Sequence, residues 1–438
     1  MKNLIKNVTV LTMDENNTVF EKGAVLFEED KILQVGENIS ESSADTVIDG
    51  KNGILMPGMI NCHSHISMVP FRSMGDDCRD RLRRFLFPLE NDAMTPELVY
   101  ARARYAVCEL LLSGVTTITD MYYFEDMVAK ACRETGIRAF LGETVINQPV
   151  CDSKDFRQTM ENTENFLKKY QNHPLVHPMV APHATNTNTA EQLVRAKKLA
   201  DKYGAKYTLH VSEMDYEMAY FKDTYNKTPV EFLRDLGVMD ENTIAAHCIH
   251  LTNEDVDLFA KTGAKIAHCV AANTKSGKGV APIYSALNKG VTVGIGTDGP
   301  SSGNTLDLFT QMRMIPLAQK TKYHNRSIMR AAEVVNMATV GGAKVLGIEK
   351  EVGTLEPGKK ADMVLIETDS VNMFPLYNPF SALVYSARAE NVSSVWVNGI
   401  QLVRDKQLVN MDLSAEKAAL LAQMGDFIAH SKNYKEYI

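Results

Sequence analysis

The sequence predicts a (β/α)8 TIM-like barrel with a small β-sandwich domain that the two ends of the chain form together. Strand-like and helix-like stretches alternate about eight times through the middle of the chain, several strand-like runs end in His or Asp, and short β-like runs occur near both ends. Such alternation favours a parallel sheet, and this number of repeats favours a closed barrel. The chain has 438 residues, whereas a bare barrel needs roughly 250, which leaves room for a second domain.

The predicted β-sandwich domain comprises residues 1–58 and 355–410. Period-two runs separated by Gly and Asn indicate short strands at 8–11, 23–27, 31–36, 361–366 and 392–399. We expect residues 59–354 to form the barrel, because its strand-like and helix-like stretches lie there. Residues 411–438 are expected to form a C-terminal helix with a polar tail.

Composition excludes several classes of protein. The formal net charge of −7 gives no reason to expect a nucleic-acid partner, since such proteins usually carry a basic face. Seven cysteines without a C-x-x-C pair indicate reduced thiols, which favours a cytoplasmic location. No run approaches the roughly 20 apolar residues of a membrane helix, and the first residues do not resemble a signal peptide. We therefore expect a cytoplasmic enzyme that acts on a small molecule away from membranes.

The strongest local motif is His63-Ser64-His65. Residues two apart on a strand point to the same side, so His63 and His65 can hold one cation from one face. Three further groups lie at the ends of later predicted strands: His210 with Glu213, then His247, and then Asp298. The carboxyl ends of barrel strands meet at one mouth, which is where barrel enzymes carry out their chemistry.

This set of side chains predicts a catalytic metal. A catalytic zinc usually has three protein ligands and an open position for water. His63, His65 and His210 supply nitrogens, and Asp298 supplies an oxygen that can also accept a proton from the water. We expect one divalent ion per subunit, zinc or alternatively iron. The predicted fourth strand, 176–183, has no Lys or Glu that could bridge two ions.

The residues beside the ligands suggest the catalytic roles. Glu213 is placed to shuttle a proton to the substrate. His247 would polarise the attacking hydroxide and the developing tetrahedral centre. The other zinc deaminase pattern, H-x-E with P-C-x-x-C, does not occur in the sequence.

At this level of detail the sequence resembles the amidohydrolase superfamily, and within it the S-adenosylhomocysteine/5′-methylthioadenosine deaminases. The resemblance spans nearly the whole chain. It rests on motifs at 57–58 with 63–65, 113–117, 181–183, 210–213, 245–248, 273–275 with 279–282, 296–299 and 353–362.

The resemblance implies an activity and a ligand set. The activity is metal-dependent hydrolytic deamination of an adenine-type nucleoside (S-adenosylhomocysteine, 5′-methylthioadenosine or adenosine) to the inosine-type product and ammonia. The enzyme would thus be a hydrolase of C–N bonds in cyclic amidines. His63, His65, His210 and Asp298 would hold the metal, and Glu213 would protonate the ring nitrogen beside the attacked carbon. A homo-oligomer is also an expectation from the resemblance.

It further implies substrate-binding residues. Glu90 would contact the ribose hydroxyls, His183 the purine ring, and Arg157 a carboxylate on the substrate. The chain departs from the family in two places. The segment 77–85 carries four arginines where the family has an acidic, Trp-containing helix, and a solvated face is favoured over an anion clamp there. Residues 142–144 read Gly-Glu-Thr where homocysteine-accepting members place an Arg, so the 5′ group of the substrate stays open.

Two other functions stay open. The first is hydrolysis of another aminated heterocycle, namely guanine, a pterin or an s-triazine, by the same barrel-end residues. The second is a binding protein that keeps the barrel without turnover. Glu213 counts against the second alternative, because binding alone does not need a proton shuttle.

Overall fold

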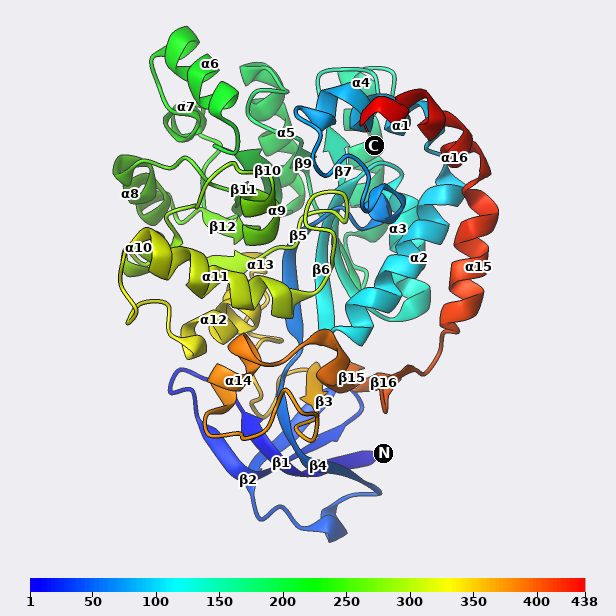
Figure 1. Ribbon diagram of the computed structural model, residues 1–438, viewed down its shortest axis with the longest axis vertical. Helices are drawn as coiled ribbons and strands as arrows, with labels where there is room; N and C mark the ends of the chain where they lie inside the picture. Colours follow the sequence, from blue (N-terminus) through cyan, green and yellow to red (C-terminus); the bar gives the residue numbers. More distant parts are fainter. Residues whose placement is uncertain (438) are drawn as a thin grey trace.

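The structure is a computed structural model that describes residues 1–437, and it has two parts stacked along the long axis of the molecule (Figure 1). A barrel of parallel strands surrounded by helices forms the upper part. A β-sheet that contains the N-terminus forms the lower part. Among the described residues, no helix is both long enough and apolar enough to cross a membrane.

The barrel strands run in two parallel arcs. One has the order β5-β6-β7-β8, with β9 pairing β7, and the other has the order β10-β11-β12-β13. Nearly all their residues are buried, as expected of parallel strands covered by helices. The strands are β5 (Met59–Ser64), β6 (Val115–Tyr122), β7 (Arg138–Val145), β8 (Val176–Pro178), β9 (Ala181–Pro182), β10 (Tyr207–Val211), β11 (Thr243–His247), β12 (Lys265–His268) and β13 (Val293–Ile295).

The first seam between the arcs lies beside β8 and β9, which are two pieces of one interrupted fourth strand. Val180 bridges to Tyr207 in parallel, and Ala184 bridges to His210. Pro178 and Pro182 have no N–H to donate to a ladder, which weakens regular pairing in this strand.

The second seam joins β13 to β5. The backbone N–H groups of Thr297 and Asp298 donate to the carbonyl of His63 at 3.1 and 3.0 Å. A Cβ atom on Gly296 would lie 2.9 Å from the Cβ of His63 and 2.8 Å from the Sγ of Cys269, so only glycine allows this approach. Both seams close the ring, and the predicted (β/α)8 barrel is confirmed.

Helices follow the strands and cover the outside of the barrel (Figure 1). Several begin at a Thr or Asp whose side chain accepts a backbone N–H of the first turn, such as Thr189, Thr228 and Asp155. The helices are α1 (Phe87–Ala93), α2 (Pro96–Leu112), α3 (Glu125–Thr135), α4 (Phe156–Tyr170), α5 (Ala190–Tyr203), α6 (Asp215–Tyr225), α7 (Pro229–Asp235), α8 (Asn253–Thr262), α9 (Val270–Lys275), α10 (Ile283–Asn288), α11 (Leu308–Lys322), α12 (Ala331–Ala338) and α13 (Val340–Leu346), with short turns η2 (Ile66–Phe71) and η3 (Leu82–Leu86) after β5.

Strands from both ends of the chain form one sheet in the lower part, with the order β17-β16-β15-β14-β4-β1-β2-β3. The antiparallel pair β4–β14 joins the two ends, and a separate apolar core contains residues of both, including Phe27 and Trp396. This agrees with the predicted β-domain, although its exact boundaries stay a prediction. The strands are β1 (Lys2–Leu11), β2 (Val19–Glu28), β3 (Lys31–Glu37), β4 (Thr46–Pro57), β14 (Met363–Ile366), β15 (Val392–Val397), β16 (Ile400–Arg404) and β17 (Gln407–Leu408), with the turn η1 (Glu41–Ser43) between β3 and β4.

A buried ion pair connects the two parts. Arg138, the first residue of β7, pairs with the carboxylate of Asp362, and each side chain is only 2% exposed. The same guanidinium donates to the Asn398 side chain, whose backbone N–H in turn donates to Asp362 Oδ1 at 2.8 Å.

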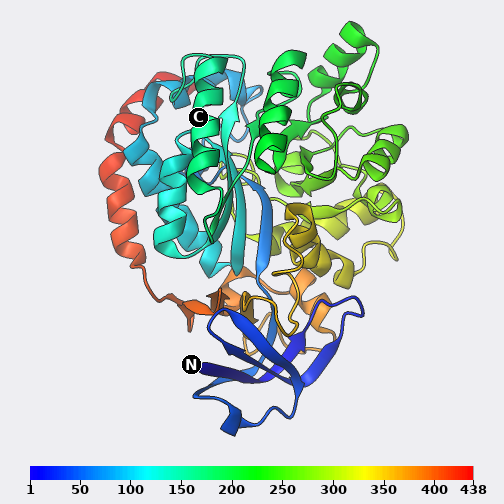
Figure 2. The same ribbon diagram turned by 180° about the vertical axis from the view of Figure 1, so that it is seen from behind.

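The C-terminal segment returns to the barrel. Two helices and a turn, α15 (Leu413–Gln423), α16 (Gly425–Ser431) and η5 (Lys432–Tyr437), replace the single predicted helix and tail, and Ile438 lies outside the described residues. Figure 2 shows α15 running along the outside of α2, where Arg104 forms an ion pair with Glu416. One more helix, α14 (Pro379–Tyr385), lies within the segment predicted to be β-rich and packs against α11 and α12.

Candidate active site

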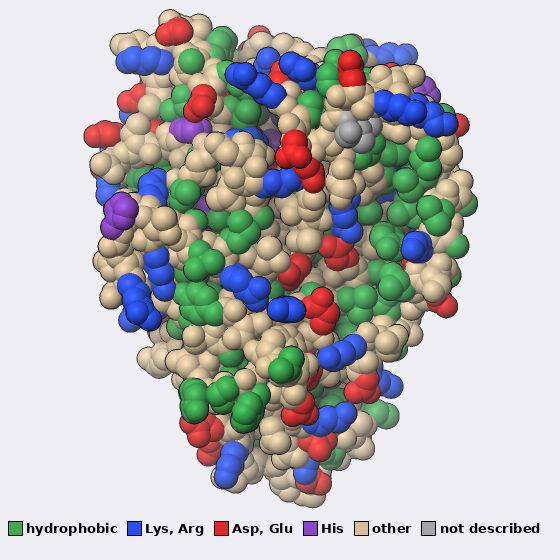
Figure 3. Space-filling view, viewed as in Figure 1, with side chains coloured by type: hydrophobic (Ala, Val, Ile, Leu, Met, Phe, Trp, Pro, Cys, Tyr) green, Lys and Arg blue, Asp and Glu red, His purple; other side chains and the backbone are tan. Residues whose placement is uncertain are grey.

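A cavity of about 900 Å³ lies at the carboxyl ends of the barrel strands. Its lining includes most of the residues singled out from the sequence, together with the segment after β5 and the loop after α9. In Figure 3 the visible histidine side chains lie on the barrel half of the molecule, whereas Lys, Arg, Asp and Glu side chains are spread over both halves.

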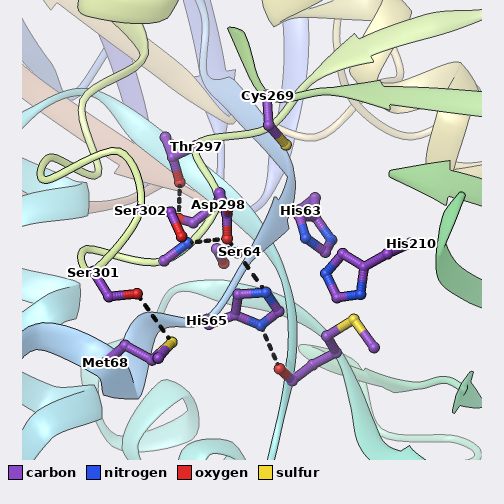
Figure 4. A network of polar contacts seen from close by, with 12 residues as sticks. His63, Ser64, His65, Met68, His210, Cys269, Thr297, Asp298, Ser301 and Ser302 are labelled. Atoms are coloured by element: carbon purple, nitrogen blue, oxygen red, sulfur yellow. Dashed lines mark hydrogen bonds and ion pairs between the residues drawn. The ribbon is translucent and has the colours of Figure 1, made fainter. Parts of the chain in front are cut away.

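Three imidazoles, those of His63, His65 and His210, lie close together, and the last two line the cavity (Figure 4). The ring centroid of His63 lies 4.9 Å from those of both His65 and His210. The Nε2 atom of His63 is buried and has no hydrogen-bond partner among the described residues. A buried nitrogen without a partner costs free energy, which a bound metal ion would offset.

Backbone carbonyls fix the orientation of two of these rings. The Nδ1 of His65 donates to the carbonyl of Met121 at 2.7 Å, and the Nδ1 of His210 donates to the carbonyl of His183. Because a carbonyl only accepts, each ring keeps its Nε2 lone pair for the cavity. This is the arrangement found behind metal-binding histidines in general.

The donor set fits one divalent ion. Two overlapping groups, His63 with His210 and His247, and His63 with His65 and Asp298, each have ligand atoms within 4.8 Å of one another. Burial lowers the pKa of His63 and His210 well below 6.5, so these imidazoles are neutral, as ligands must be. The predicted ligands thus lie together, with His247 beside them.

Asp298 completes the group from the turn after β13. The backbone N–H of Gly299 donates to its Oδ1 at 2.6 Å, and the same oxygen lies 3.3 Å from His65 Nε2 (Figure 4). Its φ of +61° is uncommon for a residue with a side chain, and His247 has a φ of +68°. Strained backbone of this kind clusters at active sites, where the surrounding structure holds it.

His247 presents one nitrogen to the cavity. Its Nδ1 contacts the side-chain Oδ1 of Asn273 at 2.8 Å, which places the proton on Nδ1 and the lone pair on Nε2. The Nε2 atom lies 3.8 Å from Glu213 Oε1 and 3.9 Å from Asp298 Oδ2. His247 therefore stands between the two carboxylates predicted to handle protons.

Glu213 lies on the turn after β10 and is held from two sides. The buried carboxylate of Glu217 accepts the backbone N–H groups of Ser212 at 2.9 Å and Glu213 at 2.8 Å. The ammonium of Lys278 lies 2.5 Å from Glu213 Oε1. Burial raises the pKa of Glu213, but His247 and Lys278 outweigh that effect and bring the pKa well below 4.5.

The predicted substrate-binding residues Glu90 and His183 also line the cavity. Glu90, on α1, accepts the hydroxyl of Tyr122 at 2.6 Å, and burial raises its pKa to about 7 although that hydrogen bond opposes the shift. His183 Nδ1 contacts the hydroxyl of Thr187 at 3.1 Å. Burial lowers the pKa of His183 to about 4, so its ring is neutral at pH 7.

Arg157 lies elsewhere. It is on α4, its side chain is 78% exposed, and it pairs with Glu161 one turn along the same helix at 3.4 Å. It does not line the cavity. Its position gives no support to the prediction that it binds a substrate carboxylate.

Several residues at the site were missed from the sequence. Lys278 lies between the motif segments 273–275 and 279–282, and Glu217 lies four residues after Glu213. The prediction of a solvated face at 77–85 holds for only part of that segment. Arg79 and Arg83 are exposed, whereas Arg81 is half-buried and bonds to the loop after β13.

A parallel barrel with a buried His and Asp group at its mouth and an acid beside that group defines the class of metal-dependent barrel hydrolases. The chain belongs to the amidohydrolase family, whose model matches residues 54–402. These residues contain the whole predicted metal group.

Curated relatives and solved structures agree with this family. The chain is 36% identical to 5-methylthioadenosine/S-adenosylhomocysteine deaminase 1 of Syntrophus aciditrophicus, over 93% of this chain and 94% of the relative. It is 36% identical to 5′-deoxyadenosine deaminase of Methanosarcina barkeri, with the same shares of the two chains. It resembles the crystal structure of an adenosine deaminase from Xanthomonas campestris with bound zinc, with a TM-score of 0.93, 27% identity and 98% of both chains covered.

Proposed function

We propose that this protein is a metal-dependent aminohydrolase that converts an adenine-type nucleoside to the inosine-type product and ammonia. The observation that carries the proposal is the convergence of the metal group and the Glu213 carboxylate in one cavity. The deaminase names of the relatives support the same substrate class.

His63, His65, His210 and Asp298 would hold the ion, for which we propose zinc, with iron as the alternative. Bound there, a divalent ion would lower the pKa of a coordinated water and supply hydroxide at neutral pH. The Oδ2 of Asp298 lies 3.9 Å from the Nε2 of His247 and would accept a proton of that water. The Nε2 of His247 would orient the attacking oxygen from the same side.

Glu213 would deliver a proton to the ring nitrogen beside the attacked carbon. Its carboxylate is anionic in the structure and lies between Lys278 and His247, so it can take up a proton and pass it on. Protonation of the ring nitrogen makes the carbon more electrophilic. After the hydroxyl oxygen has added to the carbon, its remaining proton would pass through Asp298 to the amino nitrogen, which leaves as ammonia while the carbonyl forms.

Glu90 and His183 would hold the nucleoside. An ionised Glu90 is acceptor-only and can take both hydroxyls of a ribose, while Tyr122 fixes its orientation. A neutral His183 can hydrogen bond to a ring nitrogen of the purine without adding charge. The substrate candidates are S-adenosylhomocysteine, 5′-methylthioadenosine and adenosine.

The test is ammonia release by the zinc-reconstituted protein against adenosine, 5′-methylthioadenosine, S-adenosylhomocysteine, guanine, a pterin and melamine. We expect rapid turnover of the nucleosides, with an inosine-type spectrum. The Glu213→Gln variant should retain zinc but lose about 10²- to 10⁴-fold in kcat, whereas the exposed control Glu161→Gln should match the wild type. Activity confined to a free base or a triazine would refute the nucleoside assignment and leave the other heterocycles.

A further inference from the structure

Arg81 presents a cationic side chain to the cavity without a carboxylate partner. Its guanidinium donates to the carbonyl of Ser301 and, at 2.9 Å, to the hydroxyl of Ser302. Both acceptors are neutral, and within residues 1–437 Arg81 forms no ion pair. A guanidinium has five N–H donors, so donors remain for a ligand.

The two lysines on this rim are neutralised by carboxylates, whereas Arg79 and Arg83 are exposed to solvent. Lys275 also donates to Ser301 at 3.5 Å, but its ammonium lies 2.7 Å from the carboxylate of Asp76. Lys278 is paired with Glu213 at 2.5 Å. Arg81 is therefore the guanidinium at this rim that is both half-buried and without a counter-ion among the described residues.

The carboxylate of Asp298, which follows β13 three residues before Ser301, lines the same cavity as Arg81. Asp298 belongs to the proposed metal group, and a metal ion would take up its charge. With the site loaded, the cavity beside Arg81 would then carry excess positive charge. A partly desolvated cation without a partner is costly, unless a ligand supplies the anion.

We propose that Arg81 recognises an anionic group on the substrate, a carboxylate or a phosphate, and so makes the protein prefer anionic adenine nucleosides over neutral ones. This inference rests on the proposed deaminase function. The planar fork of arginine matches both anions in two parallel hydrogen bonds, a geometry that lysine cannot copy. Arg81 would therefore supply the anion recognition that neither residues 142–144 nor Arg157 offers.

The test compares substrates that differ only in charge. Adenosine 5′-carboxylate and adenosine 5′-carboxamide have nearly the same shape but differ in charge. Adenosine 5′-phosphate tests phosphate as the alternative anion. For the zinc-loaded protein we expect kcat/KM to be at least about tenfold higher for the carboxylate or the phosphate than for the carboxamide, as for a hydrogen bond to a charged group. The better of the two anions identifies the natural class.

The variants separate charge recognition from structural damage. Arg81→Met should reduce the anion-to-carboxamide ratio of kcat/KM about tenfold, and Arg81→Lys should restore only part of it. The exposed control Arg330→Met should leave the ratio unchanged. Equal losses on anionic and neutral substrates, or no preference in the wild type, would overturn the role of Arg81 while leaving the deaminase function standing. No turnover of any nucleoside would overturn both.

Discussion

The ammonium of Lys278 lies 2.5 Å from the carboxylate of Glu213, across the mouth of the barrel. The two residues are 65 positions apart, one on the turn after β10 and the other on the loop after α9. Glu217 holds the backbone of the same turn from the opposite side. The proposed proton shuttle is therefore fixed in both position and charge.

Replacing Lys278 with Met should impair the proton shuttle. Loss of an adjacent cation raises the pKa of a carboxylate, so the acid limb of the kcat profile should move to higher pH. We expect the pH at which kcat falls to half its plateau to rise by about one unit, which is a tenfold change in kcat on the acid limb itself. Lys278→Arg should restore most of the profile. The control Lys289→Met removes a similar surface ion pair, with Asp257, and should not move it.

Metal binding should depend on His63. Its Nε2 has no other partner among the described residues, so His63→Ala removes a ligand without freeing a hydrogen bond. Zinc at about 100 times its Kd should stabilise the wild type by about 2.7 kcal/mol, measured as a rise in Tm. The variant should lose this zinc-dependent rise, while the exposed control His324→Ala keeps it. An equal rise in both variants would place the metal elsewhere.

The pH dependence of kcat/KM should reflect the ionisation of the Glu90 carboxyl group. Burial raises its pKa to about 7, and only the ionised carboxylate can accept two ribose hydroxyls. For the wild type, kcat/KM should therefore rise as the pH increases through about 7 and level off above it. Glu90→Gln should lose about tenfold in kcat/KM at pH 8 and should not show the rise. A Glu90→Gln profile that still rises near pH 7 would assign this ionisation to another group.

Much of the fold and of the site was predicted from the hydrophobic periodicity and from the polar residues at the ends of the predicted strands. The positions of His63, His65, His210, His247 and Asp298 at strand ends were readable because a parallel barrel gathers those ends at one mouth. The interruption of the fourth strand is a local effect of two prolines within a short apolar run, and alternation alone does not locate it.

Contacts between distant segments were not readable in the same way. The segment 77–85, with four arginines in nine residues, was predicted to be a solvated face. Only its contact with the loop after β13 distinguishes Arg81 from the neighbouring arginines. The pairing of Lys278 with Glu213 likewise depends on how two loops cross, which no local pattern encodes. The role of Arg157 was predicted from the resemblance, and this residue lies on an exposed helix face outside the cavity.

The stability of the whole molecule should depend on the ion pair between Arg138 and Asp362. Both side chains are 2% exposed, so Asp362→Ala would leave a buried guanidinium without its counter-ion and take an acceptor from the backbone of Asn398. We expect a loss of about 3–5 kcal/mol in the free energy of unfolding, measured by urea denaturation. The double variant Arg138→Met with Asp362→Leu should lose much less, because it removes the unpaired charge as well.

Breaking the exposed pair of Arg330 and Glu333 should cost at most about 1 kcal/mol. If Asp362→Ala cost no more than this surface control, the pair would not be what holds β7 to the β-domain.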